Sequence, residues 1–138
     1  MNVSLPRLVP DPAPGELTSR YLRQSNLYVP STERVKPRAF HPDPKHQTSV
    51  FRVEGLTEPQ IWRLGDTFVN LPSGNKPQAR AELLVSQITG LGLRVEPKEP
   101  PVRHANIEGW ALEKHERMSQ AQDLAAVASL RLRTTHPT

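Results

Sequence analysis

The sequence predicts a small α+β domain. We expect a split βαβ, or ferredoxin-like, sheet of three to four mostly antiparallel strands covered by helices, with an extended N-terminal arm. Four observations support this prediction. Short stretches alternate between apolar and polar residues, as half-buried strands do, and longer stretches repeat apolar residues at helical spacing. Prolines recur throughout the first 44 residues, and the total of 138 residues suits a single domain.

The N-terminal third divides into two predicted parts. Residues 1–19 should form a flexible, proline-rich tail, because closely spaced prolines remove backbone donors and favour extended conformations. Residues 20–48 should form a basic extended arm, with one short helical turn around Tyr21 and Leu22. We therefore expect this third of the chain to depend on contacts with other groups rather than on its own hydrogen bonds.

Residues 49–138 are predicted to form the α+β domain. Its clearest local signal is the segment Thr57-Glu58-Pro59-Gln60. This segment combines a threonine N-cap, a proline in the first turn and a glutamine at the third helical position. Apolar residues follow at helical spacing, so the capping box predicts a helix from residue 58 to residue 69.

The other elements follow from the same two periodicities. We expect a strand over 49–54, a helix over 78–89, strands over 93–96 and 102–107, a helix over 112–128 and a last strand over 130–133. The resulting order is strand, helix pair, strand, strand, helix and strand. That order is close to the split βαβ arrangement with one additional helix.

The composition excludes several classes of function. The chain has no cysteine, which excludes disulfides, thiolate nucleophiles and cysteine-bound metal centres. Its apolar runs are far shorter than a membrane span, and its first residues lack the charged start and apolar core of a signal peptide. We therefore expect a cytoplasmic protein that does not enter a membrane. The segment Gly90-Leu91-Gly92 lacks the third glycine of a dinucleotide loop, and we expect no cofactor.

Positive charge is concentrated in the predicted arm. The net charge is +4, yet the window from residue 20 to residue 52 holds seven basic and two acidic residues. Basic side chains neutralise phosphates, while aromatic side chains stack on unpaired bases or anchor protein interfaces. The residues that we expect to bind a nucleic acid or a protein partner are Arg34, Lys36, Arg38, Lys45, Tyr28, Phe40 and Trp62.

His104 is the strongest candidate for chemistry, because it lies where a predicted strand leads into a turn and a helix. Residues 104, 106 and 108 share one face of a strand, which places His104, Asn106 and Glu108 side by side. Such a set could bind a phosphate or carry out acid–base catalysis. It could equally be the solvent face of an edge strand, with Ala105 and Ile107 inward.

Two further histidines, His41 and His46, flank Asp43 on a predicted loop. Two imidazoles and a carboxylate are suitable ligands for zinc or another transition metal. Their spacing matches no standard metal-binding signature, so the sequence predicts ordinary polar loop residues and no metal.

These observations favour a non-catalytic accessory or adaptor protein. It would dock the basic arm and one face of the domain onto a larger protein or nucleoprotein partner. Three alternatives remain open. The domain could bind nucleic acid in its own right, it could be a small His104-dependent enzyme acting on a phosphodiester or nucleotide, or the arm could be exchanged between identical chains in a homo-oligomer.

Overall fold

The computed structural model describes residues 5–6, 8–69, 71 and 74–134. One sheet contains β1 (Leu17–Leu22), β4 (Thr48–Arg52), β5 (Ala79–Leu84), β6 (Arg94–Pro97), β7 (His104–Glu108) and β8 (Ser129–Leu132). A separate short hairpin pairs β2 (Tyr28–Val29) with β3 (Arg34–Val35). The helices are α1 (Glu58–Phe68), α2 (Val85–Thr89) and α3 (Lys114–Val127), and three 3-10 turns are η1 (Ser25–Leu27), η2 (Pro30–Thr32) and η3 (Pro37–Phe40). The class is therefore α+β, as predicted.

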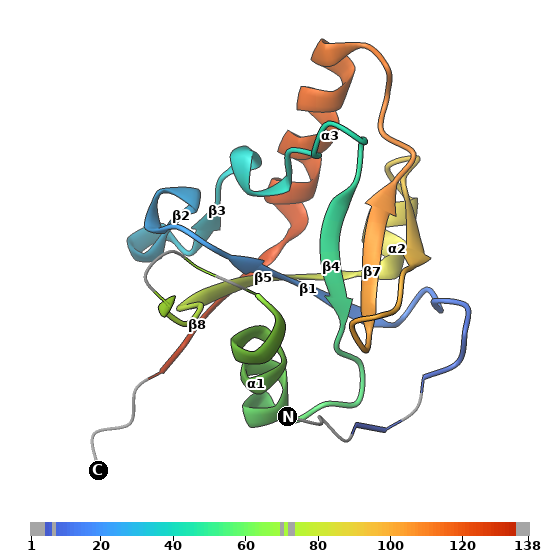
Figure 1. Cartoon of the computed structure of the whole chain (residues 1–138). Helices are drawn as coiled ribbons and strands as arrows, with labels where there is room; N and C mark the ends of the chain where they lie inside the picture. The colour runs from blue at the N-terminus through green and yellow to red at the C-terminus, as the bar shows by residue number, and fades with distance from the viewer. Residues whose placement is uncertain (1–4, 7, 70, 72–73, 135–138) are drawn as a thin grey trace.

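The strand order in the sheet is β6-β7-β4-β1-β5-β8, and all neighbouring strands are antiparallel. We call β4, β7 and β6 the β4 half of the sheet, and β1, β5 and β8 the β1 half. The halves join through two residue pairs, Thr18 with Arg52 and Ser19 with Phe51, whereas β1 and β5 pair along six residues. β4 and β7 run in clearly different directions from β1 and β5 (Figure 1). The sheet is therefore strongly twisted where the halves meet.

The ferredoxin-like prediction is confirmed in part. In the β4 half, β7 lies between β4 and β6 and is antiparallel to both, which is the arrangement of a split βαβ unit. The sheet has six strands rather than three or four. The last strand, β8, does not lie beside β4, because β1 and β5 lie between them.

The segment Leu17–Leu22 differs most from the prediction. We assigned it partly to a flexible tail and partly to an arm with a helical turn, but it forms β1 in the middle of the sheet. Thr18 and Leu22 are buried on one face, and Ser19 and Tyr21 are buried on the other. A strand covered on both faces shows no clean alternation of apolar and polar residues, which explains why the pattern was missed.

The predicted helix over 78–89 is also partly wrong. Residues Ala79–Leu84 form β5, and only Val85–Thr89 form a helix. Alanine, arginine, glutamate and leucine favour helices in isolation, but pairing with β1 and β8 overrides that preference. The predicted capping box of α1 is confirmed, since Thr57 Oγ1 accepts from the Gln60 backbone and Gln60 Oε1 accepts from the Thr57 backbone. The remaining predicted strands and the long helix lie within two residues of their expected bounds.

Different elements cover the two faces of the sheet. α2, α3 and η3 pack on the face that carries Val50, Ala81 and Ile107, which forms the larger apolar core. α1 packs on the opposite face, which we call the α1 face, through Leu64 and Gly65. Gly65 lies directly against the Tyr21 ring: a Cβ at this position would be 2.6 Å from Cε1 of Tyr21.

Two buried arginines hold the proline-rich N-terminal segment that we predicted to be a flexible tail. Arg52 donates to the carbonyl of Pro10 at 3.1 Å and forms an ion pair with Glu16 at 2.6 Å. Arg103 donates to the carbonyl of Pro6 at 2.7 Å. Prolines have no N–H, so their carbonyls are the backbone groups that can anchor such a segment. Among the helices of the described residues, none is long and apolar enough to cross a membrane.

Candidate functional site

A pocket of about 570 Å³ opens beside the junction of the two sheet halves, where β1 and β4 stop pairing. We call it the His104 pocket. Polar groups come from both halves and from the loop before β4, and the end of α1 supplies an apolar wall. Its lining includes Arg20, Arg23, Asp43, Ser49, Phe51, Phe68 and His104.

His104 and Ser49 form the chemically most significant pair in this pocket. Ser49 Oγ lies 2.7 Å from His104 Nε2, and His104 Nδ1 lies 2.8 Å from the carbonyl oxygen of Lys98. A carbonyl oxygen can only accept, so Nδ1 carries a proton. In the neutral imidazole Nε2 is then the acceptor, and the Ser49 hydroxyl donates to it. This is the tautomer that a histidine needs in order to take a proton from a serine.

The imidazole ring is also held by packing. Phe51 lies opposite His104 in the ladder between β4 and β7. The two ring centroids are 5.4 Å apart in an edge-on arrangement. Phe51 is itself buried. The orientation of the His104 ring is therefore held by two contacts, the Phe51 ring and the Lys98 carbonyl. Ser49 is exposed, so its hydroxyl is accessible from the pocket.

Arg20 brings positive charge next to Ser49. Its guanidinium donates to the carbonyl of Ala39 and, at 2.6 Å, to the carbonyl of Ser49. Both partners are neutral. Burial and the neighbouring charge of Arg23 lower the pKa of Arg20 to about 10, against a smaller opposing influence of Asp43.

The three candidates on β7 lie on one face, as the alternation predicted, but they do not act on one another. Glu108 accepts hydrogen bonds from Gln47 at 3.2 Å and from Arg94 at 3.3 Å, and Asn106 is buried. The partners of His104 are instead Ser49 and a backbone carbonyl. Sequence reasoning missed Ser49 because its position opposite β7 depends on the register between two strands. A backbone carbonyl leaves no signal in a sequence.

The residues expected to bind a partner separate into exposed cations and covered aromatics. Arg34, Lys36, Arg38 and Lys45 are all exposed, while Tyr28 is half-buried and packs against the core. Phe40 is fully buried and Trp62 is 8% exposed. The structure therefore leaves neither Phe40 nor Trp62 free to anchor a partner.

The histidines considered for metal binding do not form a site. Asp43 Oδ1 accepts from the backbone N–H groups of Lys45 at 2.8 Å and Gln47 at 3.0 Å, so this carboxylate organises its own loop. His41 lines the His104 pocket, and His46 adopts a left-handed backbone conformation. Within the described residues, no group of three or more histidine, aspartate or glutamate side chains could hold a metal ion.

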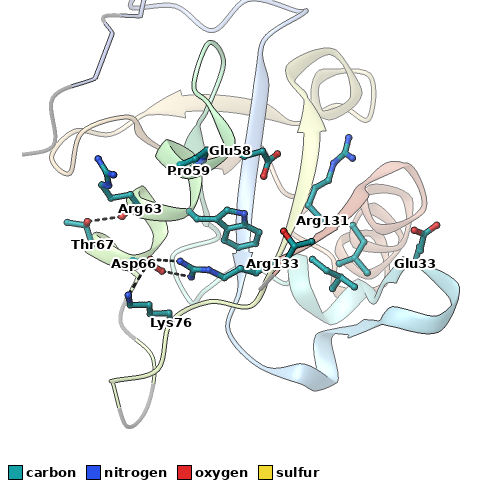
Figure 2. Close-up of a pocket in the computed structure, with 13 residues that line it drawn as sticks. Glu33, Glu58, Pro59, Arg63, Asp66, Thr67, Lys76, Arg131 and Arg133 are labelled. Carbon is teal, nitrogen blue, oxygen red and sulfur yellow. Dashed lines mark hydrogen bonds and ion pairs between the residues drawn. The ribbon is translucent and has the colours of Figure 1, made fainter. Parts of the chain in front are cut away.

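A second, larger hollow of about 1110 Å³ lies between α1 and β8 (Figure 2). Two of its cations share one carboxylate. Arg133 makes two 2.7 Å contacts with the Asp66 carboxylate, and Lys76 Nζ lies 4.0 Å from the same carboxylate. The Arg133 guanidinium also lies 5.2 Å from the centre of the Trp62 ring. These pairs leave this hollow less suited to an anion than the His104 pocket.

Comparisons with protein-family models, with curated proteins and with solved structures found no match to this chain.

Proposed function

We propose that this protein binds a phosphate-bearing ligand, a nucleotide or a phosphodiester, in the His104 pocket. One observation carries the proposal: a half-buried arginine with only neutral hydrogen-bond partners lies beside a hydrogen-bonded serine and histidine. A phosphate group would supply a negative charge next to this arginine, and it would accept hydrogen bonds from the arginine and the serine.

The donors around the pocket suit phosphate oxygens. Arginine presents several N–H groups in a planar fork, and charge-assisted hydrogen bonds from such groups to phosphate are stronger than neutral ones. Arg20 has two of its N–H groups engaged with carbonyls, and Arg23 lines the same pocket. The Ser49 hydroxyl can turn from His104 to an anion and would add one further donor. Asp43 also lines the pocket and would oppose an anion.

The size and walls of the pocket suit a nucleotide. A volume of about 570 Å³ lies within the roughly 300–1,000 Å³ that small-molecule sites occupy. Phe51 and Phe68 are stacked, with ring centroids 6.2 Å apart, and together with Val69 they form an apolar wall. A base could lie against this wall while its phosphate approaches Arg20.

Calorimetric titration of the full chain tests the proposal, with adenosine monophosphate as the probe and adenosine as the ligand that lacks phosphate. We expect adenosine monophosphate to bind more tightly than adenosine. The His104→Ala variant should bind it roughly twofold to tenfold more weakly, because the Ser49 hydroxyl loses the partner that orients it and one neutral hydrogen bond contributes about 0.5–1.5 kcal/mol. His115→Ala on α3 is the matched control, since His115 is exposed and does not line this pocket. Equal affinity for the two ligands, or no effect of His104→Ala, would contradict the proposal.

A second candidate function is the adaptor role predicted from the sequence, in which the basic arm docks onto a larger protein or nucleoprotein partner. The observation that favours it is the exposure of all four predicted cations, Arg34, Lys36, Arg38 and Lys45. If Arg34, Lys36 and Arg38 contact a single-stranded nucleic acid, changing all three to alanine should lower the slope of log affinity against log salt by about 2, since each phosphate contact contributes about 0.7. Fluorescence anisotropy with a labelled single-stranded oligonucleotide measures this slope. An affinity that does not depend on salt would exclude this form of the adaptor role.

A further inference from the structure

We infer that Ser49 is a nucleophile and that the protein hydrolyses a phosphate ester bound in the His104 pocket. This inference rests on the proposed function, because the ester must first bind beside Arg20. It goes further in assigning a covalent step to one hydroxyl oxygen.

The geometry around Ser49 meets the requirements for an activated serine. The hydroxyl donates to Nε2 of His104 at 2.7 Å, and the Lys98 carbonyl holds the other ring nitrogen at 2.8 Å. A serine, a histidine base and a third group that orients the base form the usual arrangement of a serine nucleophile. Here the orienting group is a backbone carbonyl instead of a carboxylate.

Ser19 shows that this arrangement is not a general property of serines in the sheet. Ser19 lies on β1 opposite Phe51, on the α1 face, and it is fully buried. Its Oγ has no hydrogen-bond partner among the described residues. Ser49, one strand away, is exposed and has a histidine aligned with its hydroxyl.

The reaction runs in two balanced steps. In the first, Ser49 Oγ forms a bond to phosphorus and passes its proton to Nε2 of His104, and the bond from phosphorus to the ester oxygen breaks. The departing oxygen takes that proton from His104 and leaves as an alcohol. In the second, water attacks phosphorus and gives a proton to Nε2, the bond from phosphorus to Oγ breaks, and Oγ regains a proton. The net reaction converts an ester and water into an alcohol and phosphate.

Arg20 places a positive charge beside the reacting atoms. Its guanidinium donates to the carbonyl of Ser49 at 2.6 Å, so the charge is fixed close to the nucleophile by the backbone of that same residue. A preorganised cation of this kind stabilises the negative charge that develops on the phosphoryl oxygens.

Reaction of the full chain with a fluorophosphonate probe tests the inference. Attack by Ser49 would form a bond from Oγ to phosphorus and release fluoride, and peptide mass spectrometry would identify the labelled residue. We expect labelling at Ser49 that is absent in Ser49→Ala and about a hundredfold slower in His104→Ala, as is typical for loss of a general base. Ser19→Ala should be labelled at the normal rate.

The calorimetric titration, repeated on the same protein, separates failure of this inference from failure of the proposed function. Absence of labelling at Ser49 in protein that binds adenosine monophosphate would overturn the nucleophile and leave the binding site intact. Absence of both labelling and binding would overturn both. Labelling that is equally fast in His104→Ala would overturn the assignment of His104 as the base.

Discussion

The two halves of the sheet carry similar polar sequences on the α1 face but use them differently. In the β1 half, Arg80 and Glu82 lie two residues apart on the same face of β5, and both are buried. In the β4 half, His104 and Glu108 lie on the same face of β7 and are only half-buried, and Ser49 on the neighbouring strand is exposed. α1 supplies Glu58 and Asp66, which form ion pairs with Arg80 on β5 and with Arg133 directly after β8. The charges of the β1 half therefore have a structural role as ion-pair partners, whereas Ser49 and His104 face a pocket and are accessible for chemistry.

The β1 half retains its buried charges because they are paired. Arg80 has a fully buried side chain and lies 2.7 Å from Glu58 and 3.1 Å from Glu82. The Arg80 guanidinium also lies over the Trp62 ring at 4.6 Å. Burial alone would lower the pKa of Arg80, but its hydrogen bonds to Glu58 and Glu82 raise that pKa overall. The β1 half of the sheet is therefore stabilised by the charged form of Arg80.

The largest expected effect is that of Arg80→Ala. Removing one partner of a buried ion pair should destabilise the fold by about 3–5 kcal/mol, because Glu82 is then left buried with less compensation. Urea unfolding measures this loss. Arg94→Ala is the matched control in the β4 half: Arg94 also forms two ion pairs, but its side chain is 56% exposed, so its loss should cost about 1 kcal/mol or less. Equal destabilisation by the two variants would contradict the conclusion that the β1 half depends more strongly on its ion pairs than the β4 half.

The same comparison explains what the sequence could predict. The β4 half and α1 were predicted because Leu93-Arg94-Val95-Glu96 alternates cleanly and Thr57-Glu58-Pro59-Gln60 is a recognisable capping box. In the β1 half, β8 was predicted, but β1 and β5 were missed because β1 is buried on both faces and β5 consists largely of helix-favouring residues. Local patterns do not record the pairing partner that decides between a strand and a helix.

The candidate site was predictable only in part for a similar reason. His104 was identified because its residue type and its place before a turn are visible in the sequence. Ser49 lies near His104 because of the register between β4 and β7. Arg20 reaches the same pocket because β1 and β4 stop pairing next to it. These are properties of long-range pairing. The basic residues of the arm were counted correctly, but the count could not show that Arg20 is half-buried and lines a pocket while Arg34 is exposed.

The smallest expected effect concerns Glu58, which connects α1 to the β1 half. A hydrogen bond from Arg80 lowers the pKa of the Glu58 carboxyl, although burial opposes this shift. A lowered pKa in the folded state means that the carboxylate form stabilises the fold. This contribution is complete above the ordinary carboxyl pKa and is lost as the pH falls through the lowered pKa. Since the side chain is 64% exposed, the contribution should be less than about 1 kcal/mol.

Glu58→Gln should therefore be less stable than the natural chain near neutral pH, and the difference should disappear in strong acid, where Glu58 itself is protonated. Urea midpoints measured from about pH 7 down to about pH 2 would show the two curves converging. Asp123→Asn, a change at an exposed position of α3, is the control for the general effect of removing a carboxylate. A constant difference across the whole pH range would show that Glu58 acts through packing or capping at the start of α1 rather than through its charge next to Arg80. In that case the ion pairs that distinguish the β1 half would reduce to those between Arg80, Glu82 and Arg131.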